Sequence, residues 1–363
     1  MAGTKRLTID KVEPGMRLAD VVLNEMGKVL LEKGTVLTEA LLQRMQEWNV
    51  MSVVVAEAET APTVSTQADP VATEWQNSMQ TPKEFSDPYH DTVERVRVIF
   101  QQLRQKEPLP LQEIFSLVKG PISYMINAVG VINHLQQEYH LSDYTYHHSV
   151  NVAIITGLLG KWLELSKTEL FDLIVSGLLH DVGKSQIPSE ILDKPSQLTP
   201  EEMALVQQHA YFGYQIVRQE KALSANAVCG ILQHHERMDG SGYPLHAKKD
   251  AIHLFGRIVA IADIYDAMTS NRSYREKVAP FTVIEALIND MYQKLDVEIC
   301  TVFLNNVRDC FLGNIVVLNN GQQAEVIYLG QFMAARPVVR TDKGEFIDLE
   351  RRKDLSIVKL MHK

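Results

Sequence analysis

The chain has 363 residues and a formal net charge of −9, with 45% hydrophobic and 22% charged residues. This acidic balance argues against a general binder of nucleic-acid polymers or anionic membranes, because such proteins need a basic surface. The three cysteines, Cys229, Cys300 and Cys310, lack the spacing of a disulfide framework and indicate a reducing compartment. The first residues contain no apolar signal segment, and the apolar runs are too short to cross a bilayer. The sequence therefore predicts a cytoplasmic protein.

The first 56 residues are predicted to form a small α+β domain. Short apolar runs broken by Gly27 and Gly34 indicate strands, residues 38–50 have helical spacing, and residues 51–58 indicate a closing strand. Residues 57–87 are rich in Thr, Ser, Pro and Ala and show little periodicity. We expect this segment to be a flexible linker.

Residues 88–320 have a helical pattern and form the main predicted domain, so the fold class is mainly α. Val93, Val96, Phe100 and Leu103 occupy one face of a helix. The sequence Thr199-Pro200-Glu201-Glu202 is typical of a helix start, with an N-cap, a proline at the first position and acids in the first turn.

The pattern changes again near the end of the chain. Asn320-Gly321 stands between two apolar runs, which is a strong hairpin signal. We therefore expect residues 321–363 to form a C-terminal β extension.

Chemistry-bearing residues gather within the helical domain. Asp181 follows an apolar segment, and burying its charge would cost several kcal/mol unless it is paired or bound to metal. Asp263 and Asp266 interrupt another apolar segment at i, i+3 spacing, so they share a helix face. Mixed imidazole and carboxylate ligands suit Fe, Mn, Zn or Ni. The histidines of this region that have such neighbours are His148, His180, His209, His234 and His235.

Five imidazoles with Asp181 and Asp263 exceed what one tetrahedral site needs. They suit two metals bridged by a carboxylate, which activate a water for attack on phosphorus or a carbonyl. Lys184, one helical turn after Asp181, could stabilise developing oxyanion charge. Each residue alone has an ordinary explanation, since a lone histidine is commonly a core or surface residue. The His234-His235 pair could be a helix end facing solvent, and His147 abuts His148.

Five segments, taken in order, resemble the HD-GYP family, a branch of the HD metal-dependent phosphohydrolases. The resemblance covers residues 121–321, and residues 1–56 also resemble a small domain of unknown function that often precedes HD-GYP domains. The resemblance to the HD-GYP family implies a helical phosphodiesterase that hydrolyses cyclic di-GMP to linear pGpG, GMP or both. The segments are "YTYHHSVNVA", "LLHDVGK", "KPSQLTPEE…QQHAYFGYQIV", "HHERMDGSGYP" and "RIVAIADIYDAMTSNRSYR".

The resemblance also implies a role for each matching residue. Two divalent cations are expected, first Fe or Mn, with Zn, Ni, Co or Mg also compatible, and Asp181 bridging them. Lys184 would contact the scissile phosphate or its nucleophilic water, and Asp266 would orient a ligand or an arginine. Gly242 and Tyr243 would lie near the substrate, whose phosphate or guanine Arg272 and Arg275 would clamp. The implied ligands are His148, His180, Asp181, His209, His234, His235 and Asp263.

One departure from the family concerns the number of metals. Some members hold a third metal through an acid four residues before the first histidine, where this chain has Tyr144. We therefore expect a dinuclear site.

Several alternatives remain open. The substrate could be another cyclic dinucleotide, such as cyclic GMP-AMP. The chain could instead be a non-catalytic receptor or scaffold that binds a diguanylate cyclase through its GYP loop, although its complete ligand set favours an enzyme. A homodimer is also compatible with the sequence.

Overall fold

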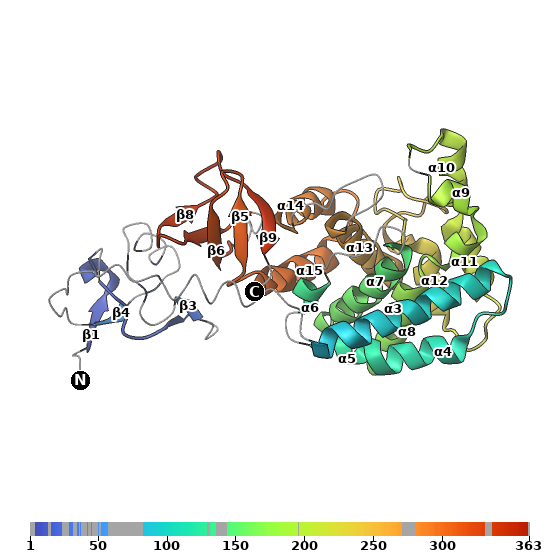
Figure 1. The fold of residues 1–363 in the computed structure, drawn as a ribbon, viewed down its shortest axis with the longest axis horizontal. Helices are drawn as coiled ribbons and strands as arrows, with labels where there is room; N and C mark the ends of the chain where they lie inside the picture. The colour runs from blue at the N-terminus through green and yellow to red at the C-terminus, as the bar shows by residue number, and fades with distance from the viewer. Residues whose placement is uncertain are drawn as a thin grey trace.

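The computed structural model describes residues 4–13, 16–23, 29–31, 35, 37, 42, 45, 50, 52–56, 83–128, 131–135, 144–194, 196–270, 280–330 and 336–361. A helical bundle and a small β-sheet make up most of this part of the chain, and they share one hydrophobic core (Figure 1). None of the helices in the described ranges is long and apolar enough to cross a membrane.

The helical bundle is mainly α, as predicted. Its helices include the short 3-10 helices η4 and η5 and the π-helical segment η2. In chain order they are α3 (Lys83–Arg104), α4 (Leu111–Leu117), η2 (Val118–Ile122), α5 (Ser123–Ile126), α6 (Val131–His134), α7 (Tyr144–Trp162), α8 (Lys167–Leu179), η4 (Val182–Gln186), α9 (Ser189–Leu192), α10 (Pro200–Gln207), α11 (His209–Val217), α12 (Ala225–Gln233), η5 (Lys249–Ala251), α13 (Leu254–Thr269), α14 (Pro280–Met291) and α15 (Val297–Cys310).

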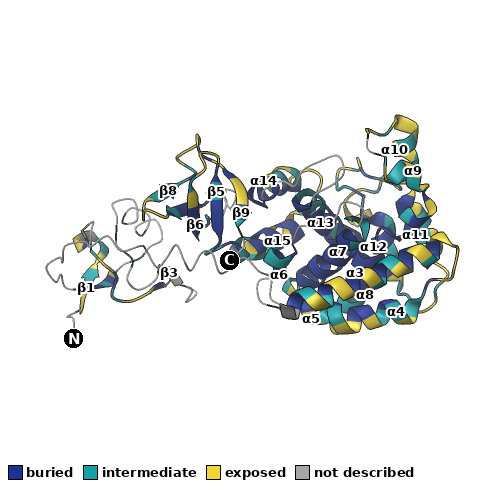
Figure 2. Ribbon diagram, viewed as in Figure 1, coloured by how far each residue is buried: buried dark blue, intermediate teal, exposed yellow. Residues whose placement is uncertain are grey.

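Helix α7 is the central helix of the bundle. Its residues from His147 to Gly160 are all buried, and α3, α8 and α13 pack against it. A helix that is apolar on every side has to be enclosed by neighbours, and Figure 2 shows α7 as a buried helix behind α3. The few polar side chains that α7 carries are therefore held inside the core.

Helix α3 is amphipathic, and its predicted apolar face is confirmed. Val93, Val96, Phe100 and Leu103 are all buried in the main core, while the outer face of the helix is exposed (Figure 2). The helix begins at Lys83, so the last residues of the segment expected as a linker, 57–87, are helical. The remainder of that segment lies outside the described residues.

The start of α10 also follows the sequence prediction. The Thr199 side chain accepts a hydrogen bond from the Glu202 amide, and the Glu202 carboxylate accepts one from the Thr199 amide, which completes a capping box. Pro200 occupies the first turn.

The C-terminal part is a five-stranded antiparallel sheet with strand order β8-β7-β6-β5-β9. The predicted hairpin at Asn320-Gly321 is confirmed between β5 and β6, and Gly321 has φ +82°, in the left-handed region. The sheet begins at Ile315 rather than at residue 321, because β5 follows closely on α15. Its strands are β5 (Ile315–Leu318), β6 (Gln323–Tyr328), β7 (Val338–Thr341), β8 (Phe346–Asp348) and β9 (Ile357–Met361).

The N-terminal part has a separate hydrophobic cluster that includes Leu18, Val53 and Val55. The predicted closing strand is present as β4 (Ser52–Ala56), which pairs antiparallel with β1 (Thr4–Thr8). A short pair, β2 (Val22–Leu23) and β3 (Val29–Leu31), and the 3-10 helix η1 (Ile9–Lys11) complete its described elements. Most of the helix predicted over residues 38–50 lies outside the described residues.

Gly183 determines how closely η4 packs against α11. A Cβ at this position would lie 1.9 Å from the His209 carbonyl oxygen and 2.4 Å from the Gly213 amide nitrogen. Both neighbours are backbone atoms, which cannot move aside as a side chain would. Only glycine permits this approach.

We therefore predict that Gly183→Ala lowers the free energy of unfolding by about 3 kcal/mol or more, since overpacking against backbone cannot relax locally. Chemical denaturation followed by circular dichroism measures the change. Gly120→Ala is the matched control, because a Cβ there meets nothing within 4 Å. Equal stability of the Gly183→Ala protein and the wild type would contradict this account of the packing.

Candidate metal centre

Seven buried or half-buried side chains form two adjoining clusters, and within each cluster the potential ligand atoms lie within 4.8 Å of one another. All seven residues were predicted as ligands from the sequence. One cluster contains Asp181, His209, His234 and His235, and the other contains His148, His180 and Asp263.

Most of these side chains come from the ends of helices. His180 and Asp181 directly follow α8, His209 begins α11, and His234-His235 directly follow α12. The two exceptions, His148 in α7 and Asp263 in α13, lie within buried helices that pack against each other. The bundle thus brings together residues that are far apart in sequence.

Asp181 lies between the two clusters. Its Oδ1 is 3.2 Å from His209 Nε2, and its Oδ2 is 3.4 Å from His180 Nε2 and 3.7 Å from His148 Nε2. The two carboxylate oxygens therefore face different clusters, which is the arrangement a bridging ligand requires.

Three of the histidines have their Nε2 atoms directed inward by hydrogen bonds on the other side of the ring. The Nδ1 atoms of His180, His209 and His234 lie 2.6–2.8 Å from backbone carbonyl oxygens three residues earlier. A ring nitrogen beside a carbonyl has to donate, so Nδ1 carries the proton and Nε2 keeps its lone pair. Each imidazole is thereby prepared to bind a metal through Nε2.

The electrostatics of the clusters also fit metal binding. Burial lowers the pKa of His209 to about 4 and holds that of His234 well below its usual value, so both rings are neutral at neutral pH. Burial would raise the pKa of Asp181, but the Lys184 ammonium and nearby imidazoles outweigh it and keep that pKa well below normal. Neutral imidazole and ionised carboxylate are the protonation states that bind metal.

His148 differs from the other histidines. Burial lowers its pKa, but hydrogen bonds with Asp263 and Asp266 outweigh burial and raise that pKa to about 9. Asp263 Oδ1 is 3.1 Å from Nε2, and Asp266 Oδ2 is 2.6 Å from Nδ1. Two carboxylates therefore favour positive charge at this point, which a divalent cation would also supply. Asp266 lies behind the ring, where an orienting residue was expected.

Lys184 is the basic residue at the edge of the clusters. Its Nζ donates a hydrogen bond to Asp181 Oδ2, and its side chain is 21% exposed. The ammonium thus lies between the buried carboxylate and solvent. This is the position from which it could reach a bound anion.

The GYP loop, which contains Gly242, Tyr243 and Pro244, folds back over the His234-His235 pair. The Tyr243 ring lies 4.6 Å from the His235 ring, and the Tyr243 amide donates to the His235 carbonyl. A Cβ on Gly242 would lie 2.3 Å from that same carbonyl oxygen, so the loop approaches closely only with glycine there. Burial raises the pKa of Tyr243, which keeps its hydroxyl protonated.

The buried Glu236 carboxylate holds the residues that follow the GYP loop through hydrogen bonds to their backbone amides. The residue is 2% exposed, and its two carboxylate oxygens accept hydrogen bonds from the amides of Leu245 and Ala247. From the sequence, Glu236 was interpreted as a structural or supporting residue, with no partner named. Backbone amide partners leave no residue pattern, so nothing in the sequence indicated the contact.

Four further residues complete the account of the site, two of which are not described by the structure. Arg272 and Arg275 lie outside the described residues. His147, which the sequence left ambiguous, directs its Nδ1 to the Tyr89 hydroxyl, 3.0 Å away. Asn151, one turn after His148, hydrogen-bonds Asp266 and was not predicted. Its polarity inside an apolar helical run was the available signal.

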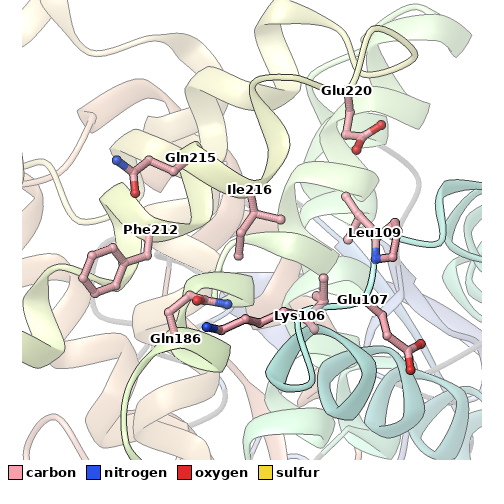
Figure 3. A pocket seen from close by; sticks show the side chains of 10 residues that line it. Lys106, Glu107, Leu109, Gln186, Phe212, Gln215, Ile216 and Glu220 are labelled. Atoms are coloured by element: carbon pink, nitrogen blue, oxygen red, sulfur yellow. The ribbon is translucent and has the colours of Figure 1, made fainter.

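A separate pocket of about 540 Å³ lies between the end of α3, η4 and α11 (Figure 3). Leu103, Lys106, Gln186, Phe212 and Ile216 are among its lining residues, and none of the seven clustered residues lines it. The pocket is therefore distinct from the candidate metal centre.

Much of the helical bundle is similar to known proteins. The HD domain family matches residues 132–299. A cyclic di-GMP phosphodiesterase of Pseudomonas aeruginosa is 35% identical over 185 residues, covering 51% of this chain and 44% of that protein. A 3'3'-cGAMP-specific phosphodiesterase of Vibrio cholerae is 35% identical over 158 residues, covering 43% and 34%. The chain thus spans less than half the length of these relatives.

A solved structure supports the fold. An HDG"Y"P protein from Bdellovibrio bacteriovorus superposes with a TM-score of 0.51 at 14% identity, covering 84% of this chain and all of that one. HD-domain phosphohydrolases bind divalent metals, and the two clusters offer the imidazole and carboxylate ligands that such metals need. Residues 132–299 of this chain are thus similar to the HD domain family, and the relatives that match this chain include cyclic dinucleotide phosphodiesterases.

Proposed function

We propose that this protein is a metal-dependent phosphodiesterase that hydrolyses cyclic di-GMP to linear pGpG, GMP or both. The observation that carries the proposal is the buried Asp181 carboxylate, whose two oxygens face two separate ligand clusters. Relatives named as cyclic di-GMP phosphodiesterases support the choice of substrate.

Two divalent cations bound here would supply a water of lowered pKa and positive charge for the phosphodiester. We propose iron or manganese, held by the seven clustered residues. The chain itself supplies neutral imidazoles at His209 and His234 and ionised carboxylates at Asp181 and Asp263, in a buried surrounding where each charge interaction is stronger than in water.

In this proposal, Lys184 and Tyr243 act on the substrate rather than on the metals. The Lys184 ammonium stabilises negative charge that builds on the phosphoryl oxygens. The protonated Tyr243 hydroxyl can donate a hydrogen bond, and its ring covers the His235 side of the centre. Arg272 and Arg275 remain proposed contacts for phosphate or guanine.

Cyclic GMP-AMP is the second candidate substrate, because a relative specific for that dinucleotide matches this chain with the same 35% identity. Hydrolysis rates for cyclic di-GMP and for cyclic GMP-AMP, measured side by side, discriminate between the two. Docking of a diguanylate cyclase on the GYP loop and a homodimer stay predictions. Leu245, which is 53% exposed beside Tyr243-Pro244, gives that loop an apolar edge.

The metal content of the protein tests the dinuclear proposal. Protein purified without oxygen should contain two metal ions per chain, and Asp181→Asn should lose both and hydrolyse cyclic di-GMP at least about 10³-fold more slowly, because the bridging charge is gone. Elemental analysis and product chromatography measure these quantities. Asp250→Asn, an exposed acid of η5, is the control and should change neither. Three bound metals, or full activity in Asp181→Asn, would contradict the dinuclear proposal.

The second prediction separates Lys184 from metal binding. Lys184→Met should retain both metals yet lower kcat by about 10²-fold, as expected when one donor to a developing oxyanion is removed. Lys194→Met is a matched control, since Lys194 also pairs with a carboxylate, that of Glu202. A kcat equal to that of the wild type would remove Lys184 from the proposed mechanism.

The third prediction concerns the GYP loop. Glu236→Gln should leave the metal content unchanged but lower the hydrogen-exchange protection of the Leu245 and Ala247 amides by about tenfold, because a glutamine NH₂ cannot accept from an amide. Hydrogen exchange followed by mass spectrometry measures protection. If the loop stays as protected as in the wild type, Glu236 is not its anchor.

A further inference from the structure

Tyr89 links the candidate metal centre to a helix outside the matched HD domain. It lies on α3, whereas the family match begins at residue 132. The side chain is 2% exposed, and its hydroxyl points toward α7 rather than toward solvent. A buried hydroxyl requires hydrogen-bond partners. That of Tyr89 contacts His147 Nδ1 at 3.0 Å and Asn151, and the second contact leads to His148.

A chain of hydrogen bonds runs from Tyr89 to that histidine. The Tyr89 hydroxyl donates to Asn151 Oδ1 over 2.8 Å, and Asn151 Nδ2 donates to Asp266 Oδ1 over 2.7 Å. The second oxygen of Asp266, Oδ2, accepts from His148 Nδ1 over 2.6 Å. All four side chains are buried.

Donor and acceptor rules give each bond in this chain one direction. Asp266, when ionised, only accepts, so the amide NH₂ of Asn151 has to face it. The amide oxygen then faces Tyr89, which has to donate to it. A flip of the Asn151 amide would place its oxygen against the carboxylate and its NH₂ against a hydroxyl. The Asp266 carboxylate therefore selects the amide orientation, and the Tyr89 hydroxyl holds the amide in it by donating to the Asn151 oxygen.

His148 depends on this support more than His180, His209 and His234 do. His180, His209 and His234 are oriented by carbonyls three residues earlier. His148 is oriented by a carboxylate of another helix, α13. Asp266 also accepts from Ser270 Oγ at 3.2 Å, a longer contact than the one from Asn151. The orientation of His148 is thus set by tertiary contacts among α3, α7 and α13.

We propose that Tyr89 is a positioning residue for the cluster of His148, His180 and Asp263, and that α3 is for this reason a functional part of the metal centre. The hydroxyl fixes Asn151, which holds Asp266 in place behind His148. This inference rests on the proposed function only in requiring that the clusters bind divalent metal.

The test uses manganese binding to the metal-free full-length chain. Tyr89→Phe removes one oxygen and should lower the Mn²⁺ affinity of one of the two sites about 3- to 10-fold. This loss is no larger than the smallest losses expected for residues that hydrogen-bond a metal ligand directly, because Tyr89 acts through Asn151 and Asp266. Isothermal titration calorimetry resolves the two sites. The loss of kcat at limiting Mn²⁺ should disappear at saturating Mn²⁺, while KM for cyclic di-GMP stays constant.

Thr92→Val is the matched control. It removes a buried hydroxyl from the same helix, one turn away, where the hydroxyl donates only locally to the Pro88 carbonyl. The control should bind Mn²⁺ as the wild type does. An equal weakening in Thr92→Val would assign the effect to general loosening of α3 and overturn the proposal.

A double-mutant cycle tests the chain of hydrogen bonds itself. In an Asn151→Ala background, or Asn151→Ser if the first does not fold, Tyr89→Phe should change Mn²⁺ affinity less than about twofold, because the link is already broken. Independent additive losses, or unchanged affinity in Tyr89→Phe alone, would overturn the inference.

A wild type that binds Mn²⁺ but hydrolyses no cyclic dinucleotide would refute the proposed function and leave this inference standing. A wild type that binds no Mn²⁺ would overturn both.

Discussion

The structure depends on one buried charge, the carboxylate of Asp181, which is 1% exposed. An unpaired carboxylate in such a place would destabilise the fold by several kcal/mol. Lys184 and the imidazoles of His180 and His209 surround it and keep its pKa low. The packing of η4 against α11, which Gly183 makes possible, brings these groups within reach. The same contacts that make the charge tolerable also make the place suitable for divalent cations.

Helix ends serve this site in two ways. They supply five of the seven clustered side chains, and their last turns supply the carbonyls that orient the histidines. Gly177, Val206 and Ile231 lie in the last turns of α8, α10 and α12, where intrahelical amide donors run out. An imidazole Nδ1–H satisfies each of these carbonyls and leaves Nε2 directed at the cluster. Helix termination and ligand orientation are thus one arrangement.

The sequence was sufficient to predict the clustered residues whose side chains are of metal-binding types and stand in apolar segments. Histidines and acids inside apolar helices or at their buried ends are costly, so His148, His180 and Asp263 were recognisable without coordinates. Tyr89 was not, because a lone tyrosine on an apolar helix face resembles an ordinary core residue. The supporting role of Glu236 was predicted but its contacts were not, because backbone amide partners leave no sequence pattern. The C-terminal sheet was underestimated for a similar reason. Only its Asn320-Gly321 turn has a distinctive sequence, whereas the pairing of β9 with β5 is a long-range contact.

The spread of the clustered residues along the chain has a mechanical consequence. They come from α7, from the ends of α8 and α12, from the start of α11 and from α13, so cations bound to them would fasten helices separated by long stretches of sequence. Because such ligands bind the folded chain and not the unfolded one, they add to its stability by mass action. The supply of metal in the cell would then govern how long each molecule survives proteolysis as well as how fast it works. A shortage of cation would reduce the amount of this protein. If the proposed function holds, cyclic dinucleotide would then persist both because each molecule works more slowly and because fewer molecules remain.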